Sequence, residues 1–359
     1  MLYSHARQEI YALNAPAARL WRNLERGIAV GAVAADLADR FGHTRAEAAL
    51  SAAALLRDWL ARGWLVEAPA RPARGWRFAA SHRYRLLGTT FRVRFGTRAQ
   101  RARVHAALAH LEVDGNARCA VALDLVADAA GHRILEDART IERCGALEGL
   151  APLVKASVWR LAVNRRRYFM EIHAAALLHR GRCVLLPGAP GSGKSTLAAA
   201  LAASGFRYLS DEAALLEEPA LTVRPVPLAL TVKTGSVPLL EPWYPGLRAL
   251  PAHQREDGTQ VRYLEPPGPA RLRDPDRTFP VSTLVFPRVA QRTELRAIPR
   301  PEALRRLLAQ CLVLPERLDP MRVQQLVGWL RGLRCFELAT GPLPAAVAAI
   351  RRAHTLERS

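Results

Sequence analysis

Apolar residues recur at helical spacing three times within the first 66 residues. The first run follows Asn14, a residue type that caps helices, and the second ends at Gly42. The third follows Thr44, which has a glutamate three residues later in the spacing of a capping box. A short apolar segment at residues 64–66 is typical of a strand. This pattern predicts a small winged-helix-like, mainly helical domain over residues 1–67.

The pattern then changes twice. Residues 68–80 contain prolines and a glycine and are expected to form a linker. From residue 84 to about residue 124 apolar and polar positions alternate, which predicts strands, whereas residues 150–163 have helical spacing. We therefore expect residues 81–165 to form an α+β part.

Residues 166–355 combine strand and helix patterns and are expected to form an α/β domain. An apolar strand pattern comes first, then a glycine-rich loop, and then a segment rich in leucine and alanine that favours a helix. Twelve of the 25 prolines lie between Pro219 and Pro280, which predicts an irregular, loop-rich excursion. The tail is helical again, with these apolar residues on one face: Leu304, Leu307, Leu308 and Cys311.

The charge of the chain is strongly basic but spread out. Lysine and arginine number 52 against 32 acidic residues, and the formal net charge is +20. No block of five or six like charges is present, so we do not expect a nucleic-acid partner. The lysines are Lys155, Lys194 and Lys233, and all other basic residues are arginines. Such a chain is expected to keep lysine where a compact ammonium group is needed.

The cysteines and the N-terminus indicate the compartment. Five scattered cysteines with no CxxC spacing argue against a disulfide framework and against a structural zinc site. They fit a reducing compartment. The first ten residues lack the apolar region of a signal peptide, and no run is long enough to span a membrane. We expect a cytoplasmic protein with no membrane partner.

The glycine-rich loop fits the pattern GxxxxGK[ST] at every fixed position. In this pattern backbone N–H groups and a helix N-terminus bind phosphates, the lysine reaches the β- and γ-phosphates, and the next hydroxyl ligates Mg²⁺. A glycine-rich turn before a core helix is the alternative, but the strand and helix on either side favour nucleotide binding. The residues expected to bind ATP are Gly188, Ala189, Pro190, Gly191, Ser192, Gly193, Lys194, Ser195 and Thr196.

Two carboxylates follow the next apolar strand. Asp211 and Glu212 come 17 and 18 residues after Lys194. One of them could hold Mg²⁺ while the other takes a proton from an incoming hydroxyl, although a solvated strand end would also be acidic. His173 precedes Gly188 by 15 residues in an apolar stretch, where a histidine is more often a packed core residue.

Together these residues resemble the catalytic domain of HPr kinase/phosphorylase. The likeness is closer to HPr-kinase-related kinases found beside ribosomally made, modified peptides, and it covers residues 81–355. It rests on His173, the loop, Leu209-Ser-Asp-Glu212, Lys233 after a proline-rich strand, and Phe286-Pro287-Arg288. The resemblance implies an α/β P-loop kinase fold with ATP and Mg²⁺ as cofactors.

The resemblance also implies roles for the site residues. Asp211 would be the general base that deprotonates an acceptor serine, and His173 would assist or orient it. Glu212 and Ser195 would serve the magnesium, and Lys233 would contact the transferring phosphate or the acceptor. A second signature of the bifunctional enzyme is missing downstream of the loop, so neither phosphorylase activity nor HPr as substrate is expected.

The N-terminal pattern is similar to PqqD-like peptide-recognition domains over residues 5–67. Such domains bind the leader of a precursor peptide by adding it as a strand to a small sheet. Few residues precede Tyr11, so the usual N-terminal strands are expected to be short or missing. A winged-helix unit for DNA binding or for packing against the kinase is the alternative.

The combined interpretation is a serine kinase that phosphorylates a precursor peptide captured through its leader. Other peptide-modifying enzymes are further expected partners, and the resemblance implies a homo-oligomer. The proline-rich excursion is expected to form the rim of the acceptor pocket, with Arg255, Arg262 and Tyr263 as contacts. An ATPase, a small-molecule kinase and a non-catalytic adaptor that presents the peptide remain alternatives.

Overall fold

The computed structural model divides the chain into two compact units, Met1–Arg71 and Pro72–Ser359. The boundary lies within the expected linker at residues 68–80. The structure describes residues 2–4, 9–11, 13, 15–26, 30–42, 44–61, 65, 76–265, 277–316 and 318–355.

The unit Met1–Arg71 is a short antiparallel hairpin and three helices. Its elements are β1 (Leu2–Ser4), β2 (Glu9–Tyr11), α1 (Ala15–Glu25), α2 (Val30–Phe41) and α3 (Arg45–Ala61). Thr44 and Glu47 form the expected capping box, because each side chain accepts from the other residue's backbone N–H. The two N-terminal strands are present, with three residues each. The expected cap Asn14 and most of the expected strand at residues 64–66 lie outside the described residues.

The unit Pro72–Ser359 begins with a five-stranded sheet in the order β3-β4-β5-β6-β7. Its elements are β3 (Ala80–Leu86), β4 (Thr89–Phe95), α4 (Arg98–Leu108), β5 (Val121–Asp128), β6 (Gly131–Glu136), β7 (Arg139–Cys144) and α5 (Leu150–Val163). The expectation of strands throughout residues 84–124 was wrong for α4, which joins the parallel pair β4 and β5. A capping box of Thr97 and Gln100 starts this helix. Two parallel neighbouring strands must be joined by a crossover connection, and α4 provides it.

A mixed six-stranded sheet, in the order β11-β9-β10-β17-β20-β18, forms the centre of the remaining part. Strands β10, β17 and β20 are parallel, and the others run antiparallel to their neighbours. The strands are β9 (Ala174–His179), β10 (Arg182–Pro187), β11 (Arg207–Ser210), β17 (Val281–Val289), β18 (Glu294–Ala297) and β20 (Arg334–Thr340). The helices are α6 (Lys194–Ala203), α8 (Arg300–Leu308), α9 (Pro320–Arg331) and α10 (Leu343–Thr355).

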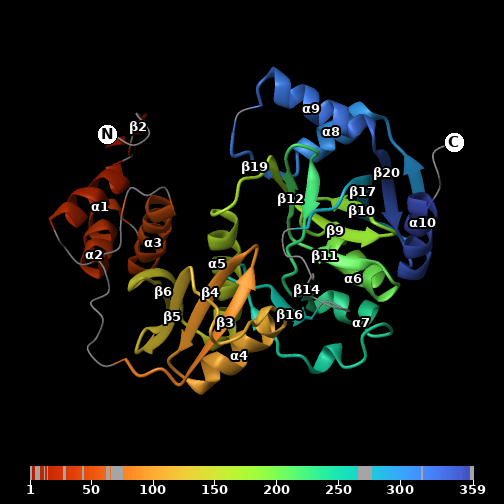
Figure 1. Ribbon diagram of the computed structural model, residues 1–359. Helices are drawn as coiled ribbons and strands as arrows, with labels where there is room; N and C mark the ends of the chain where they lie inside the picture. The colour runs from red at the N-terminus through yellow and green to blue at the C-terminus, as the bar shows by residue number, and fades with distance from the viewer. Residues whose placement is uncertain are drawn as a thin grey trace. The chain divides into compact units, whose positions relative to one another are not determined.

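Helices cover both faces of the central sheet, as Figure 1 shows with α8 and α9 on one side and α6 on the other. The alternation along β10 explains this arrangement. Val184 and Leu186 belong to the core that contains α6 and α10, whereas Cys183 and Leu185 belong to the core that contains α8 and α9. Both faces of β10 are therefore buried, which agrees with its continuous apolar pattern.

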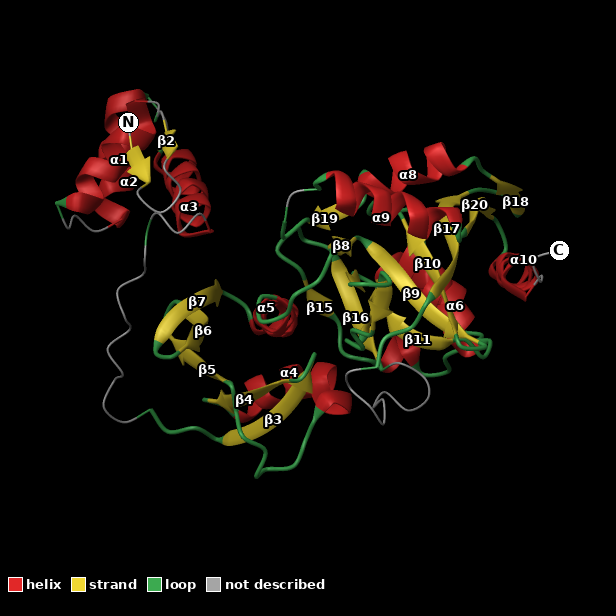
Figure 2. Cartoon of the chain, turned by 45° about the horizontal axis from the view of Figure 1, so that its top comes forward, coloured by secondary structure: helices red, strands yellow, loops and turns green. Residues whose placement is uncertain are grey.

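Two small sheets flank the central one (Figure 2). The first, in the order β13-β12-β8-β19, consists of β8 (Met170–Ile172), β12 (Ala214–Glu217), β13 (Thr222–Arg224) and β19 (Cys311–Val313). The second, in the order β14-β16-β15, consists of β14 (Leu230–Lys233), β15 (His253–Gln254) and β16 (Gln260–Leu264), and the short helix α7 (Val237–Leu240) follows β14. The proline-rich excursion thus carries short strands between its loops. The tail prediction was wrong for Cys311, which pairs with β8 because the helix ends at Leu308.

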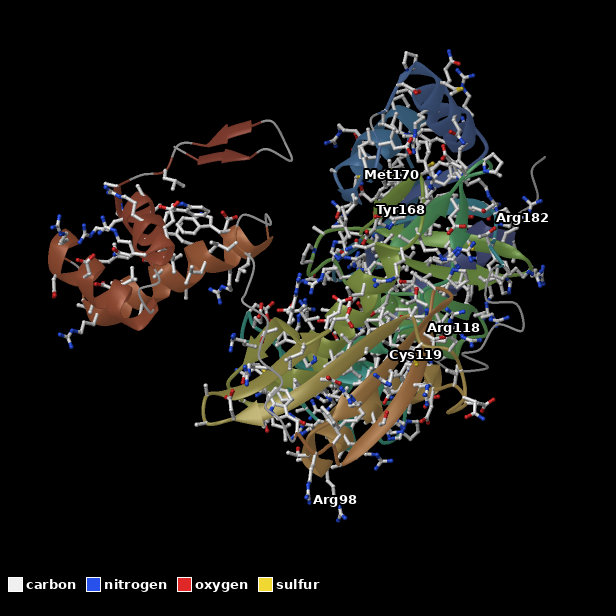
Figure 3. The ribbon with its side chains drawn as sticks, turned by 60° about the vertical axis from the view of Figure 1, so that its left-hand side comes forward. Arg98, Arg118, Cys119, Tyr168, Met170 and Arg182 are labelled. Atoms are coloured by element: carbon white, nitrogen blue, oxygen red, sulfur yellow. The ribbon has the colours of Figure 1, made fainter. Side chains whose placement is uncertain are left out.

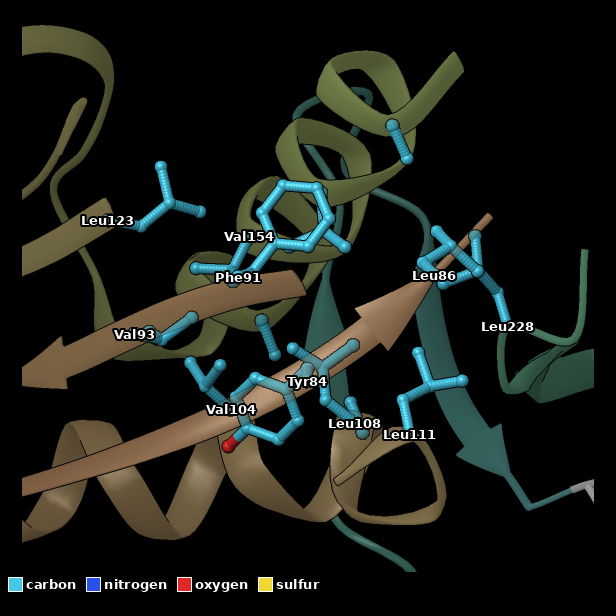
Figure 4. Close-up of a cluster of buried hydrophobic side chains, with 14 of the residues drawn as sticks. Tyr84, Leu86, Phe91, Val93, Val104, Leu108, Leu111, Leu123, Val154 and Leu228 are labelled. Atoms are coloured by element: carbon cyan, nitrogen blue, oxygen red, sulfur yellow. The ribbon is translucent and has the colours of Figure 1, made fainter. Parts of the chain in front are cut away.

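One hydrophobic core joins the first sheet to the excursion (Figure 4). Phe91 and Leu123 from the sheet and Val154 from α5 are fully buried in it. Leu228, from the segment before β14, is 4% exposed and packs in the same core. This core holds α5 against the segment that leads into β14, and so fixes the position of Lys155 on α5.

Arginine side chains project from many elements of the unit Pro72–Ser359 (Figure 3). Arg98 at the start of α4, Arg118 before β5 and Arg182 at the start of β10 are exposed and lie at separate places. The positive charge is spread over the surface, as the sequence indicated.

No helix in the described part of the chain combines the length and the apolar character that crossing a bilayer requires.

Replacing a core leucine of β10 should destabilise the unit Pro72–Ser359. Leu185 is fully buried, so Leu185→Ala is expected to lower the free energy of unfolding in urea by about 2–5 kcal/mol. Leu239→Ala is the control, because Leu239 in α7 is 57% exposed and its loss should cost less than about 0.5 kcal/mol. Equal losses for the two variants would contradict this packing.

Candidate functional site

The glycine-rich loop connects β10 to α6 and depends on glycine at three positions. Gly191 and Gly193 have φ angles of +86° and +89°, which favour glycine, and Gly193 caps α6. A Cβ atom on Gly188 would lie 2.7 Å from the hydroxyl oxygen of Ser192. The loop therefore brings the backbone close to the N-terminus of α6, where N–H groups and the helix dipole attract anions.

Lys194 places its ammonium group inside this loop. The residue is 6% exposed, and Nζ donates hydrogen bonds to the carbonyl oxygens of Gly188 and, at 3.0 Å, of Ala189. Burial lowers the pKa of Lys194 to about 8; the charge of Lys233 acts in the same direction and that of Asp211 opposes it. These interactions place Lys194 close to both residues.

The two residues after Lys194 begin α6. Ser195 is half-buried in the first turn of the helix. Thr196 donates a hydrogen bond from its hydroxyl to Ser236 Oγ at 2.8 Å, which joins the helix to the segment after β14.

Asp211 lies at the end of β11 and is 2% exposed. Its Oδ2 accepts from the backbone N–H of Thr231 at 3.0 Å, and its Oδ1 lies 2.8 Å from the hydroxyl of Tyr208. Burial raises the pKa of Asp211; Lys155 opposes this change and the charge of Glu212 adds to it. A buried carboxyl with a raised pKa can take up a proton more readily than an exposed one.

Glu212 has the opposite environment. Its side chain is 46% exposed, and Oε1 accepts from the Thr231 hydroxyl at 2.8 Å and from Lys155 Nζ at 3.3 Å. Partial removal from water acts to raise the pKa of Glu212. The charge of Lys155 and the hydrogen bond from the Thr231 hydroxyl outweigh this contribution, so the net pKa lies below its ordinary value. Among the hydrogen bonds between described residues, none involves Oε2, so this oxygen can serve a ligand.

Lys155 is the site residue that the sequence analysis did not place. It projects from α5, is 3% exposed, and donates to Thr231 Oγ1 at 2.7 Å as well as to Glu212. The ring centroid of Tyr263 lies 4.9 Å from its Nζ, so Tyr263, expected at the pocket rim, packs beside Lys155 and is 8% exposed. The rarity of lysine was a signal for this residue, since all three lysines lie at or near the site.

The hydroxyl of Tyr208 joins Asp211 to the backbone. It lies 2.8 Å from Asp211 Oδ1 and 2.9 Å from the carbonyl oxygen of Leu228, and it has a single proton. When Tyr208 donates to Leu228, the proton between Tyr208 and Asp211 must come from the carboxyl; when Tyr208 donates to Asp211, the carboxyl is ionised. The network therefore accommodates Asp211 in both protonation states.

His173 lies between β8 and β9, next to the loop. Its N–H donates to the Gln310 carbonyl at 2.8 Å, and its carbonyl accepts from Gly188 at 3.3 Å. Burial and the charge of Lys194 lower the pKa of His173, although Glu212 opposes them, so the imidazole is neutral at pH 7. Within the described ranges no hydrogen bond joins its ring to Asp211, which is held by Tyr208 and Thr231 instead.

Lys233 ends β14 and is exposed. It lies two residues after Thr231 on the same strand, so both side chains belong to one face of β14. Its charge lowers the pKa of Lys194, which places Lys233 near the loop.

The oxygen atoms of the site suit a hard divalent cation. Magnesium prefers carboxylate and hydroxyl oxygens and usually keeps several waters. Ser195 at the start of α6 and the exposed carboxylate of Glu212 supply such groups, and Asp211 adds a more deeply buried one. The donor set therefore fits Mg²⁺.

A second cluster, formed by one histidine of β3, one histidine of α4 and a glutamate that follows that helix, is satisfied by hydrogen bonds. Ligand atoms of His82, His105 and Glu112 lie within 4.8 Å of one another. However, Arg101 Nε donates to His82 Nε2 at 2.8 Å, so the hydrogen of His82 is on Nδ1, which lies 2.5 Å from Glu112. This arrangement pairs the carboxylate without a metal ion.

Removing the ammonium group of Lys155 should destabilise the protein most at neutral and alkaline pH. Burial raises the pKa of Asp211, so its ionisation costs folding free energy, and Lys155 offsets that cost. In urea titrations Lys155→Met is expected to lower the free energy of unfolding by about 2 kcal/mol at about pH 8. The loss should be smaller at about pH 5, where more of the carboxyl groups are protonated. The exposed Lys233→Met is the control and should change stability little at either pH.

Residues 1–65 match the family described as Coenzyme PQQ synthesis protein D (PqqD). Among curated proteins, none matches the chain. The family match confirms the PqqD-like part of the sequence prediction and supports a peptide-recognition domain at the N-terminus, in the unit Met1–Arg71. It covers 65 of the 359 residues and does not extend to the site described above.

Proposed function

We propose that the protein is an ATP- and Mg²⁺-dependent kinase, related to HPr kinase, that phosphorylates a serine of a ribosomal precursor peptide. The observation that carries this proposal is the meeting of two groups at one edge of the central sheet. A buried lysine lies in the glycine-rich loop after β10, and a pair of carboxylates follows β11. A phosphate-binding loop beside an acidic pair is what phosphoryl transfer requires.

In this proposal the loop and α6 bind the triphosphate. Backbone N–H groups of the loop and the N-terminus of α6 contact the phosphates, and Lys194 contacts the β- and γ-phosphates. Ser195 and Glu212 hold Mg²⁺, which neutralises charge on the transferring group. The support for this assignment is the exposed Glu212 carboxylate, whose Oε2 is available to a ligand.

Asp211 acts as the general base. The serine oxygen attacks the γ-phosphorus while its proton passes to the Asp211 carboxylate. The bond from the γ-phosphorus to the bridging oxygen breaks, and ADP leaves with that oxygen. Burial supports this role because it raises the pKa of Asp211, and so its basicity, towards working pH. Lys233 contacts the transferring phosphate, and the backbone carbonyl of His173 holds the start of the loop through Gly188.

The N-terminal domain captures the precursor through its leader. PqqD-like domains suggest this role, and the short hairpin of β1 and β2 supplies strand edges to which a peptide can add. Tethering a leader-binding domain to a kinase raises the local concentration of the acceptor serine, so the catalytic pocket needs only a short peptide segment.

The two carboxylates should have separable roles. We expect Asp211→Asn to retain ATP binding and to lose transfer by at least about a hundredfold, because the base is missing. Glu212→Gln should instead raise the Mg²⁺ concentration that half-maximal transfer requires, because a metal ligand is lost. The measurement is intact-mass spectrometry of the precursor peptide encoded beside the gene, after incubation with ATP and Mg²⁺, together with ATP affinity. If Glu212→Gln abolishes transfer at saturating Mg²⁺ while Asp211→Asn retains it, the two roles are exchanged.

The same experiment tests the proposed activity. One added phosphoryl group on a serine, absent with Lys194→Ala, supports the kinase. ATP consumption without a change in peptide mass would indicate an ATPase or a small-molecule kinase. Without any ATP consumption, the protein would be an adaptor that presents the peptide.

ATP binding should be linked to proton uptake by Lys194. With a pKa of about 8, this ammonium group is about half deprotonated at pH 8, and the nearby phosphate charge favours its protonated form. Calorimetry at pH 8, in buffers of different ionisation enthalpy, should therefore show uptake of about half a proton. The uptake should fall to about a tenth at pH 7, and affinity should decline above pH 8. Equal uptake at both pH values would contradict this assignment.

A further inference from the structure

A small cleft opens at the carboxyl ends of the adjacent parallel strands β10 and β17. It has a volume of about 190 Å³, and the residues around it include Gly188, Phe286, Arg288, Arg306, Gln310 and Glu337. The cleft is smaller than the roughly 300–1,000 Å³ of sites that enclose a drug-sized ligand. It therefore has room for one side chain or one small group.

The cleft lies on the side of the sheet covered by α8, because Arg306 belongs to that helix and Phe286 packs in the core that contains it. The loop helix α6 covers the opposite face. The two regions meet at Gly188, which borders the cleft and whose carbonyl accepts from Lys194 Nζ. His173 is bonded through its backbone to both Gly188 and Gln310.

This position is next to the proposed terminal phosphate. Lys194 is the group expected to contact the β- and γ-phosphates, and its Nζ lies at the Gly188 end of the loop. A segment that enters the cleft would consequently approach the transferring phosphoryl group. The nucleotide base, at the other end of ATP, would lie away from it.

The charges of the cleft favour an anion. Arg288, Arg305 and Arg306 border it, while Glu337 and the nearby Glu302 are their ion-pair partners. Arg296 also pairs with Glu337, so four guanidinium groups share two carboxylates. In the described part of the chain Arg288 uses only Nε, on Glu337 at 3.0 Å, so both of its terminal nitrogens can bind a further carboxylate.

We propose that this cleft binds an acidic side chain of the acceptor peptide, close to the serine that receives the phosphoryl group. The inference rests on the proposed function and names the chemistry by which the same site selects its acceptor. Arg288, at the end of β17 and 59% exposed, is the principal specificity residue. An arginine fork recognises a carboxylate through paired hydrogen bonds.

Charge reversal on both partners tests the proposal. With the full-length protein and the precursor encoded beside the gene, replacing acidic residues within four positions of the phosphorylated serine by their amides should raise KM about tenfold. Arg288→Glu should raise KM for the natural precursor by at least that factor, and by more than it weakens ATP binding. A precursor with lysine at the acidic position should restore the KM of Arg288→Glu and should be a poor substrate for the unaltered protein.

Arg160→Glu is the matched control, because Arg160 is also exposed and ion-paired, with Glu142, but lies on α5. It should leave KM for the precursor unchanged. Arg305→Gln, at a 71% exposed position, is a milder second variant should Arg288→Glu fold poorly. A precursor with no acidic residue near the serine, or a KM indifferent to Arg288 and Arg305, would overturn the proposal.

A binding measurement separates this inference from the proposed function. Fluorescence anisotropy of a labelled acceptor segment, with ADP and Mg²⁺ present, needs no phosphoryl transfer. Binding that depends on Arg288 and on the peptide's acidic residue, without any phosphorylated product, would support the cleft and reject the kinase. Phosphoryl transfer together with peptide binding that is independent of Arg288 would support the kinase and reject the cleft.

Discussion

The contact of Lys155 with Thr231 and Glu212 is the interaction on which the organisation of the site depends. It joins α5 to the end of β11 and to β14, whose contact residues come 57 and 76 residues later in the sequence. The hydrophobic core that contains Val154 and Leu228 holds α5 against the segment that leads into β14. A residue before the glycine-rich loop thereby favours the ionised form of both carboxylates after it, although burial still raises the pKa of Asp211.

The charges at this site compensate one another. Lys155 and Lys194 are buried ammonium groups, and Asp211 is a buried carboxyl group beside the more exposed Glu212. Buried charges are tolerated where an opposite charge and hydrogen bonds replace the lost water. Thr231 is central to this balance, since its backbone N–H binds Asp211 and its hydroxyl binds Glu212.

Much of the local structure followed from the sequence. The three N-terminal helices, the helix α5, and the junction of β10, the glycine-rich loop and α6 all carry strong periodicity, caps or glycine signals. The exceptions have physical reasons. The helix α4 begins at a capping box inside a stretch that otherwise alternates, and Cys311 lies beyond the end of α8, where its backbone is free to pair with β8.

The sequence by itself determined the candidate chemistry: the loop that ends in Lys194, the acidic pair after the next strand, and a peptide-recognition pattern at the N-terminus. These features are local, so spacing reveals them. Only the tertiary structure decided that Asp211 is buried while Glu212 is exposed, and that Lys155 lies beside them. Burial and charge neighbours depend on how distant segments pack, which no single stretch of sequence specifies.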